Sequence, residues 1–489
     1  MYKFTNVNKQ TKNFHSYYVS VNKTKHFFKN VLTISSAFVV FFSNCPIYSI
    51  KAATTCAFAI EGGTAGTDYT YDGGILTIKS SKPMIIKNSV PNVATTDRIE
   101  INSEANLTLA GVNIEATEGA AMKIVDNATF NVAILLADDS ENNLKGREAS
   151  FDGWHLIFGS PGKEKNGEGD NIGLLTIDVP NGSKGTGKLT TIGGGYGAGI
   201  GGGHCGDGSN IMINGGTVTA TGGDYAAGIG GGHSGDGRNI TISGGIVIAT
   251  GVYDGSGIGG GAGGNGNNIT ISGGTVTAIG GESGAGIGGG TKFGCCEGGG
   301  GCGNNIKIIG GTVTATGGGY GTGIGGGFRG NGSSITISGG EVTANGGLYG
   351  AGIGGGHCGD GSNITISSGT VIAMGGGYGA GIGGGYCGDG SNIMINGGTV
   401  TATGGDYAAG IGGGWHGSGS DITINDGTVT ANGGRLGAGI GGGCARSGNN
   451  ITISGGKVTA NGGEHADSIG GGFNGSGSNI TIKDGVLKM

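Results

Sequence analysis

The chain has 489 residues, of which 126 are glycine and five are proline, and its formal net charge at pH 7 is −6. Only 12% of the residues are charged, which excludes the basic surface of a nucleic-acid-binding protein. Collagen is excluded because no three-residue period is present, and a disordered chain is excluded because Ile, Val and Thr alternate throughout the C-terminal half.

Residues 1–52 have the features of a signal peptide. Lysines precede residues 31–42, a largely apolar run that is short for a membrane span and typical of the centre of an export signal. An uncleaved membrane anchor is the alternative. No later segment is apolar enough to cross a membrane, so we expect a secreted, extracellular or cell-surface protein without a membrane span after signal removal.

Residues 53–185 contain less glycine and no strict repeat. They are expected to form short strands at roughly ten-residue spacing, which is typical of irregular β-helix coils. The expected strands cover residues 74–78, 83–86, 98–101, 107–109, 112–114 and 132–136. We expect this region to cap the repeats that follow, because an uncovered sheet edge promotes aggregation.

Two stretches of this region resemble a known family. The string from Ala120 to Ile124 and residues 132–144 are similar to the carbohydrate-binding β-helix domain of secreted proteins from Gram-positive anaerobes. Residues 335–340 and 350–356 resemble the glycine-rich arrays that follow this domain, so the similarity covers most of residues 60–489. The resemblance implies a right-handed parallel β-helix of the pectate-lyase type that binds plant or host polysaccharide without catalysis. It transfers no individual binding residue.

Residues 186–489 consist of ten units with a period of 29 residues. One isoleucine in a GIGGG-like string marks each unit, and an eight-residue insertion near 291–305 lengthens one interval to 37 residues. The marker residues are Ile200, Ile229, Ile258, Ile287, Ile324, Ile353, Ile382, Ile411, Ile440 and Ile469. A fixed period over so many copies predicts a solenoid.

The unit from Asn363 to Ser391 predicts three short strands per coil. Residues 363–366, 370–373 and 380–382 alternate between apolar and small or polar side chains, and glycine-rich turns separate them. We therefore predict an all-β fold, a right-handed parallel β-helix. The inward rows would be Ile364, Ile366, Val371, Ala373, Ala380 and Ile382. The last coil is incomplete, so either end-to-end association covers that end or the sequence is a fragment.

Two columns of aromatic residues recur in the array. The column four residues after the marker supplies the candidate ligand-binding residues His204, His233, Phe328, His357, Tyr386, Trp415 and Phe473. The column four residues before it contains Tyr196, Tyr225, Tyr320, Tyr349, Tyr378 and Tyr407. Stacked rings form a platform for sugar rings, but they also stabilise glycine-rich corners, and both interpretations stay open. A metal site is disfavoured because Ala262 and Thr291 interrupt the histidines.

Two polar rows accompany the turns. Calcium could bind at the aspartates of the GDG strings, which are Asp207, Asp236, Asp360 and Asp389. Turn geometry is the favoured interpretation, since Asn and Ser occupy the same position in other coils. A second row predicts an asparagine ladder along one bend and comprises Asn210, Asn239, Asn268, Asn305, Asn363, Asn392, Asn450 and Asn479.

The cysteines suggest cross-links. Cys358 and Cys387 lie one period apart, hence about 4.8 Å apart in stacked coils, and predict a disulfide between coils. Cys295, Cys296 and Cys302 lie in the insertion, where a local disulfide is favoured over a metal site.

These features favour a non-catalytic surface protein that binds polysaccharide or glycan, with a purely structural stalk as the alternative. A β-helix lyase or hydrolase would need clustered carboxylates, or a carboxylate and an arginine, on one face, and the charges of the array are few and out of register. Pairs such as Thr399 and Thr401 resemble ice-binding solenoids, but Ile246, Glu341 and Lys457 interrupt the rows. A polysaccharide lyase and an ice-binding protein are therefore minor alternatives, and no cofactor other than calcium is considered.

Overall fold

The computed structural model describes residues 56–125, 128–147, 173–291, 301–483 and 487–488. The predicted signal peptide at 1–52, as well as Cys295 and Cys296 of the insertion, lies outside the described residues. Residues 54–489 form one compact unit, in which all described regular structure is β-strand. No helix long and apolar enough to span a membrane occurs among the described residues.

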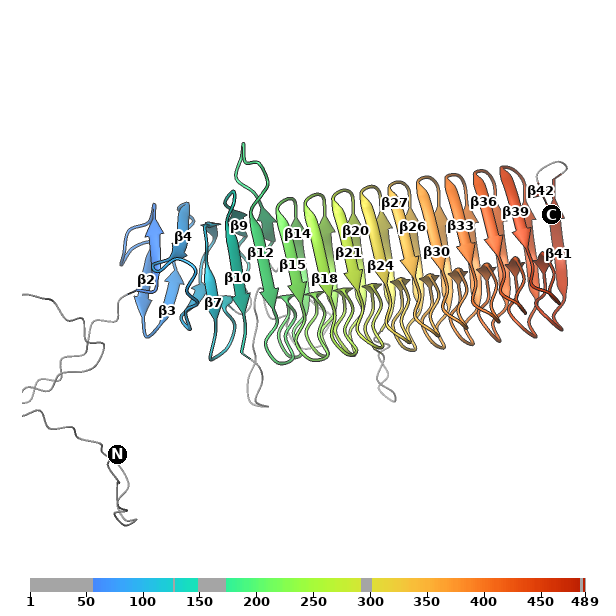
Figure 1. The fold of residues 1–489 in the computed structure, drawn as a ribbon, viewed down its shortest axis with the longest axis horizontal. Helices are drawn as coiled ribbons and strands as arrows, with labels where there is room; N and C mark the ends of the chain where they lie inside the picture. Colours follow the sequence, from blue (N-terminus) through green and yellow to red (C-terminus); the bar gives the residue numbers. More distant parts are fainter. Residues whose placement is uncertain (1–55, 126–127, 148–172, 292–300, 484–486, 489) are drawn as a thin grey trace, which may run out of the picture. The chain divides into compact units, whose positions relative to one another are not determined.

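Each regular coil contributes one strand to each of three parallel sheets (Figure 1). In the coil around Ile382, these are β29 (Gly361–Ile366), β30 (Thr370–Met374) and β31 (Ile382–Gly383). Connections between parallel strands of one sheet are right-handed in nearly all proteins. The predicted right-handed parallel β-helix with three strands per coil and a 29-residue repeat is confirmed.

Sheets A and C are the two longest sheets. Sheet A contains, in spatial order, β1 (Phe58–Glu61), β4 (Met84–Asn88), β6 (Ala105–Leu109), β9 (Val132–Leu136), β11 (Leu175–Asp178), β14 (Gly208–Ile213), β17 (Gly237–Ile242), β20 (Gly266–Ile271), β23 (Gly303–Ile308), β26 (Gly332–Ile337), β29, β32 (Gly390–Ile395), β35 (Gly419–Ile424), β38 (Gly448–Ile453) and β41 (Gly477–Ile482). Sheet C contains β7 (Asn113–Glu115), β10 (Glu141–Lys145), β12 (Lys188–Ile192), β15 (Thr217–Thr221), β18 (Ile246–Thr250), β21 (Thr275–Ile279), β24 (Thr312–Thr316), β27 (Glu341–Asn345), β30, β33 (Thr399–Thr403), β36 (Thr428–Asn432), β39 (Lys457–Asn461) and β42 (Leu487–Lys488).

Sheet D consists of ten two-residue strands, each formed by a marker isoleucine and the glycine after it. They are β13 (Ile200–Gly201), β16 (Ile229–Gly230), β19 (Ile258–Gly259), β22 (Ile287–Gly288), β25 (Ile324–Gly325), β28 (Ile353–Gly354), β31, β34 (Ile411–Gly412), β37 (Ile440–Gly441) and β40 (Ile469–Gly470). The ten strands pair in parallel, so each marker lies on the next, as Ile353 does on Ile382.

The N-terminal part of the solenoid replaces sheet D by sheet B and contains two antiparallel pairs. Sheet B comprises β2 (Tyr69–Asp72), β3 (Ile75–Ile78), β5 (Arg98–Ile101) and β8 (Met122–Ile124). β1 pairs antiparallel with β4, and β2 pairs antiparallel with β3. These pairs place antiparallel strands at the N-terminal edges of sheets A and B, where the regular parallel stacking stops.

The core is a set of stacked rows of identical or similar apolar side chains. Ile364, Ile366, Val371, Ala373 and Ile382 are all 0% exposed. Parallel registers such as Ile364 with Ile393 place each row one coil above the next. The predicted inward rows are therefore confirmed, and the core runs continuously from the N-terminal region into the repeats.

The asparagine ladder is also confirmed. The row of asparagines adopts φ between 50° and 55°, the left-handed region that asparagine tolerates better than most residues. The side-chain amide of Asn239 donates to Oδ1 of Asn210 at 3.0 Å, and Asn268 donates to Asn239 at 3.1 Å. Asp421 replaces one asparagine and still accepts from Asn450 at 3.0 Å. The ladder bonds join the bends of neighbouring sheet A strands in the repeats, as from β14 to β17 and from β17 to β20.

Close backbone contact makes glycine obligatory after the marker. Gly354 has φ of +133°, and a Cβ atom there would lie 2.0 Å from the carbonyl oxygen of Gly383 in the next coil. Both the conformation and the contact exclude a side chain. The same holds at the equivalent glycine of neighbouring coils, such as Gly325 and Gly412.

We expect Gly354→Ala to lower the free energy of unfolding by about 3 kcal/mol, because it combines backbone strain with a clash against backbone. Gly319→Ala is the matched control, since that exposed glycine has only one atom near its Cβ position, at 3.7 Å. The control should change stability by less than about 0.5 kcal/mol. Urea unfolding followed by circular dichroism measures both, and equal stability of the two variants would contradict the packing argument.

Candidate functional site

The two aromatic columns lie at the two ends of a narrow inward loop that each coil forms around its sheet D strand. In one coil, the backbone N–H of Ala380 donates to the carbonyl oxygen of Gly384 at 2.9 Å and closes the loop. Ile382 occupies the buried end of the loop. Tyr378 and Tyr386 therefore emerge next to each other at the surface, with ring centroids 5.9 Å apart.

Backbone hydrogen bonds between coils interlock the columns. The N–H of Tyr386 donates to the carbonyl oxygen of Tyr349 at 2.9 Å, and that of Trp415 donates to Tyr378 at the same distance. Each residue after a marker is thus fixed beside the tyrosine that precedes the marker of the previous coil. The two columns form one continuous surface rather than two independent rows.

From Tyr320 to Tyr386, rings of one column are stacked and rings of different columns are nearly perpendicular. Trp415 is the exception, since its plane is 85° from that of Tyr386 and 23° from that of Tyr378. Tyr320 and Tyr349 have centroids 5.1 Å apart and planes 5° apart, and His357 and Tyr386 have centroids 5.0 Å apart and planes 8° apart. Across the columns, Tyr349 and His357 meet at 79°. Parallel rings at this spacing are offset, so part of each ring face stays uncovered by its neighbour.

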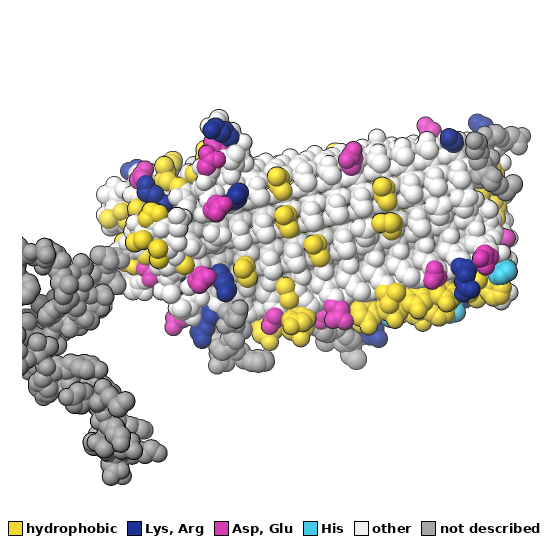
Figure 2. All heavy atoms as spheres, in the orientation of Figure 1, with side chains coloured by type: hydrophobic (Ala, Val, Ile, Leu, Met, Phe, Trp, Pro, Cys, Tyr) yellow, Lys and Arg dark blue, Asp and Glu magenta, His cyan; other side chains and the backbone are white. Residues whose placement is uncertain are grey.

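The rings of coils β25 to β34 line a shallow groove of about 620 Å³. Figure 2 shows a band of hydrophobic side chains along this edge of the solenoid. The lining residues are Ser283, Tyr320, Phe328, Tyr349, His357, Tyr378, Tyr386 and Trp415. All of these rings are half-buried, so each contributes both to packing and to the surface.

The lining contains no aspartate, glutamate, lysine or arginine. A positive charge beside the lining belongs to Arg329, whose guanidinium carbon lies 5.1 Å from the centre of the Phe328 ring. Burial lowers the pKa of His357 below its usual value of 6.5, and the Arg329 charge lowers it further. His357 is therefore neutral at pH 7, and the groove is uncharged.

The seven predicted ligand-binding residues fall into three places. Phe328, His357, Tyr386 and Trp415 lie together in the groove. His204 and His233 stack at 5.2 Å in a separate first cluster with Tyr196 and Tyr225. Phe473 contacts only the ring of His465, at 5.9 Å, among the described aromatic residues.

The sequence-based list of binding residues missed half of the lining. Tyr320, Tyr349 and Tyr378 were recognised as a column but not as part of the same surface, and Ser283 was not singled out. The sequence feature that could have identified this shared surface is the constant spacing of eight residues between the two columns, with the marker isoleucine midway between them. A loop closed by the bond from Ala380 to Gly384 converts that spacing into side-by-side placement.

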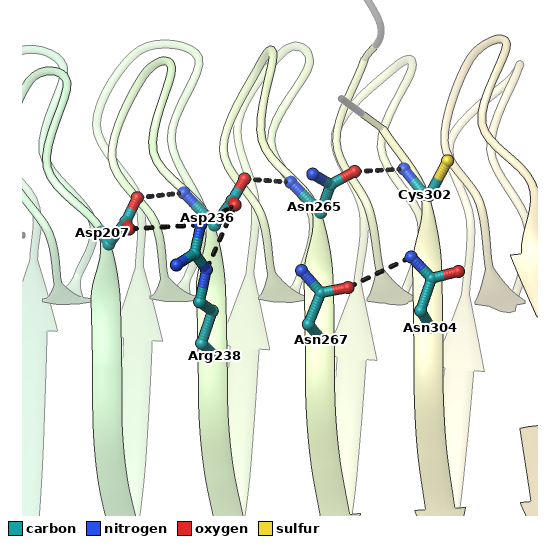
Figure 3. A network of polar contacts seen from close by, with 7 residues as sticks. All are labelled: Asp207, Asp236, Arg238, Asn265, Asn267, Cys302 and Asn304. Carbon is teal, nitrogen blue, oxygen red and sulfur yellow. Dashed lines mark hydrogen bonds and ion pairs between the residues drawn. The ribbon is translucent and has the colours of Figure 1, made fainter. Parts of the chain in front are cut away.

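The aspartates proposed for calcium accept backbone hydrogen bonds, as Figure 3 shows for Asp207 and Asp236. Oδ1 of Asp207 accepts the N–H of Asp236 at 2.8 Å, and Asp360 accepts the N–H of Asp389 at 2.9 Å. In the same way, Oδ1 of Asn331 accepts the N–H of Asp360 at 2.9 Å. An amide oxygen replaces the carboxylate without loss, which explains why Asn occupies this position in other coils.

The same row contains one ion-pair cluster, in which Arg238 lies 2.5 Å from Asp236 and 3.6 Å from Asp207. Within the described residues, no three His, Cys, Asp or Glu side chains are grouped as a metal site would require. The geometry assigns these aspartates to the bond between coils.

The structure holds Cys358 and Cys387 of adjacent coils as free, exposed thiols. The disulfide predicted between them stays a prediction. Burial and the neighbouring Cys387 thiol raise the pKa of Cys358. Cys302 of the insertion is also a free thiol.

The outward face of sheet C bears the threonine rows and few charged side chains (Figure 2). Ile246 and Ile248 are 49% and 36% exposed and interrupt these rows, as do Glu341 and Lys457. The face is therefore not a continuous threonine plane.

We expect Asp360→Ala to lower the free energy of unfolding by about 1 kcal/mol, because the N–H of Asp389 loses its acceptor. Asp360→Asn should match the wild type, since asparagine fills this role at position 331. Thermal unfolding with calcium chloride and with a chelator measures both effects. A melting temperature that rises with calcium in the wild type but not in Asp360→Asn would contradict a purely structural role.

The lowered pKa of His357 predicts a pH-dependent stability. When the pH falls below 6.5, His357 is protonated more readily in the unfolded chain than in the folded chain. The stability that neutral His357 contributes above pH 6.5 is therefore lost as the pH falls to the lower pKa of the folded state. We expect the melting temperature to fall from pH 7 to 5, and to fall less in His357→Phe. Phenylalanine already occupies the equivalent position 328, so packing is preserved. Identical pH profiles for the two proteins would exclude His357 as a contributor.

Eight segments of the chain match a family model described as a β-helix repeat. They are residues 211–233, 240–262, 269–291, 335–357, 364–386, 393–415, 422–444 and 451–473. No curated protein and no solved structure matched the chain. Each matched segment begins in a sheet A strand and ends at the aromatic column that follows a marker, so the repeat model and the structural coil agree in period and phase. The chain is a right-handed parallel β-helix repeat protein.

Proposed function

We propose that this protein is exported and binds polysaccharide or glycan at the cell surface, without catalysis, through the aromatic groove over coils β25 to β34. The observation that supports the proposal most strongly is the joining of two aromatic columns into one half-exposed surface. The groove of about 620 Å³ lies within the range of small-molecule binding sites.

The chemistry of the lining suits sugars. A pyranose ring presents C–H groups on its faces, and these pack on the uncovered parts of offset aromatic rings. The hydroxyl groups at its edge match the donors and acceptors of Tyr349, Tyr378 and His357. Hydrogen-bonding groups at the tips of apolar rings are what a binding site for such an amphipathic ligand needs.

A purely structural role for the rings explains less of the structure. The coils at β19 and β22 have Asp254 and Ser283 in one column and Ala262 and Thr291 in the other. They nevertheless stack in the regular register, with Ile258 on Ile287. Backbone bonds such as Thr291 to Asp254 at 3.0 Å persist without any ring. Coil stacking therefore does not require aromatic side chains at this corner.

The absence of acidic residues from the groove supports binding without hydrolysis. Glycoside hydrolases place two carboxyl groups on either side of the bond that they cleave. The carboxylates closest in the sequence to the lining residues are those of Glu282, next to Ser283, and of Asp360 and Asp389. The last two accept backbone hydrogen bonds in the turns that follow the rings. None of the three lines the groove.

The experiment is a glycan and polysaccharide array with the purified protein and two triple variants. The first triple variant removes three rings of the groove by the substitutions His357→Ala, Tyr386→Ala and Trp415→Ala. We expect its affinity to fall about 100-fold, because each ring contributes about 1 kcal/mol to the binding free energy. The matched control replaces Tyr196, His204 and His233 by alanine, because these rings stack in the same corner outside the groove.

The control variant should keep the affinity of the wild type while showing a similar loss of thermal stability. Equal loss of binding in both variants would indicate a general effect on folding. A folded wild-type protein that binds no glycan would favour the structural stalk.

A further inference from the structure

We propose that the ligand is an uncharged, extended polysaccharide that lies parallel to the solenoid axis and places one sugar ring on each of four coils. This inference rests on the proposed function and specifies the substrate class and direction for the same groove. It follows from the repeat of the ring pairs, from the two ends of the aromatic surface and from its charge.

The ring pairs repeat along the axis and not across it. Each of four successive coils offers one ring before and one ring after its marker, from Tyr320 and Phe328 to Tyr407 and Trp415. Equivalent rings follow one another at 5.1 to 5.5 Å in the tyrosine column, close to the coil spacing of about 4.8 Å. An extended, equatorially linked pyranose chain advances by a similar length per sugar. Such a chain meets the same surroundings at every step only if it runs along the axis.

The aromatic surface has two defined ends. On one side, the preceding coil presents Ser283 and Thr291, and on the other side the following coil presents Leu436 and Cys444. The last ring also changes direction: the Trp415 plane is 85° from that of Tyr386 but 26° from that of Tyr407, at 4.8 Å. Trp415 stacks against both Tyr378 and Tyr407 and ends the ring orientation of its own column. Four ring pairs lie within these limits.

The charges favour a neutral ligand. Recognition of carboxylates uses Arg or Lys, commonly in paired hydrogen bonds, and the lining has neither. Arg329, next to the lining residue Phe328, packs on the Phe328 ring. The turns after His357 and Tyr386 carry the exposed carboxylates of Asp360 and Asp389, which disfavour a polyanion.

The test is isothermal titration calorimetry of the purified protein with β1→4-linked gluco-, manno- and xylo-oligosaccharides of two to six sugars. We expect the Kd of the series that binds to fall with each added sugar up to four and to change less than two-fold thereafter. The C6-oxidised form of the gluco-oligosaccharides has the same linkage with a carboxylate on every sugar. It should bind at least ten-fold more weakly than the neutral form.

The variant Trp415→Ala tests whether the fourth sugar binds at the coil of Trp415. This variant should reach its plateau at three sugars, whereas Tyr196→Ala in the first cluster should leave the plateau at four. A Kd independent of length beyond two sugars, or tighter binding of the oxidised series, would overturn the axial, neutral ligand while glycan binding itself stands. Binding to no saccharide of any kind would overturn the proposed function together with this inference.

Discussion

The whole structure depends on one constraint, which is that the backbone returns to the same position after every coil. The N–H and C=O groups of each coil bond to the next, as in the pairing of Ile353 with Ile382, and these bonds need coils in direct backbone contact. Gly354 shows how close that contact is, because no Cβ atom fits beneath the carbonyl oxygen of Gly383. Since the backbone holds the coils together, the corner side chains are free to vary. The aromatic surface lies at a corner where coil stacking does not depend on the identity of the side chains.

The interior of the solenoid was predictable from sequence because it obeys simple periodicities. The alternation around Ile364 and Ile366 identified a strand, and the 29-residue repeat placed each residue on its counterpart in the next coil. The asparagine row was predictable for the same reason, since a ladder needs only one residue type at one position per coil. Their bond, as from Asn239 to Asn210, follows directly from parallel stacking.

The candidate site was predictable only in part, because it depends on contacts that a repeat does not encode. The columns of Tyr349 and His357 were recognisable in the sequence as separate rows. Their side-by-side placement depends on the closed loop between the two positions and on the backbone hydrogen bond from Tyr386 of the next coil to Tyr349. Spacing likewise places Cys358 beside Cys387 of the next coil but does not determine whether the two thiols are joined. The Asp360 carboxylate was attributed to turn geometry, with calcium as the alternative, and its bond with the backbone N–H of Asp389 in the next coil was not predicted.

The insertion near residue 291 shows how freely such a chain changes length. Eight additional residues separate Thr291 from Gly301, yet Ile269 still pairs with Ile306 and Ile287 with Ile324. A corner that absorbs extra chain leaves the registers on either side intact, so the length of this corner is independent of the ladders. Because neighbouring coils make the same ladder contacts, a chain with one coil more or fewer would have a longer or shorter aromatic surface without any new kind of contact between coils.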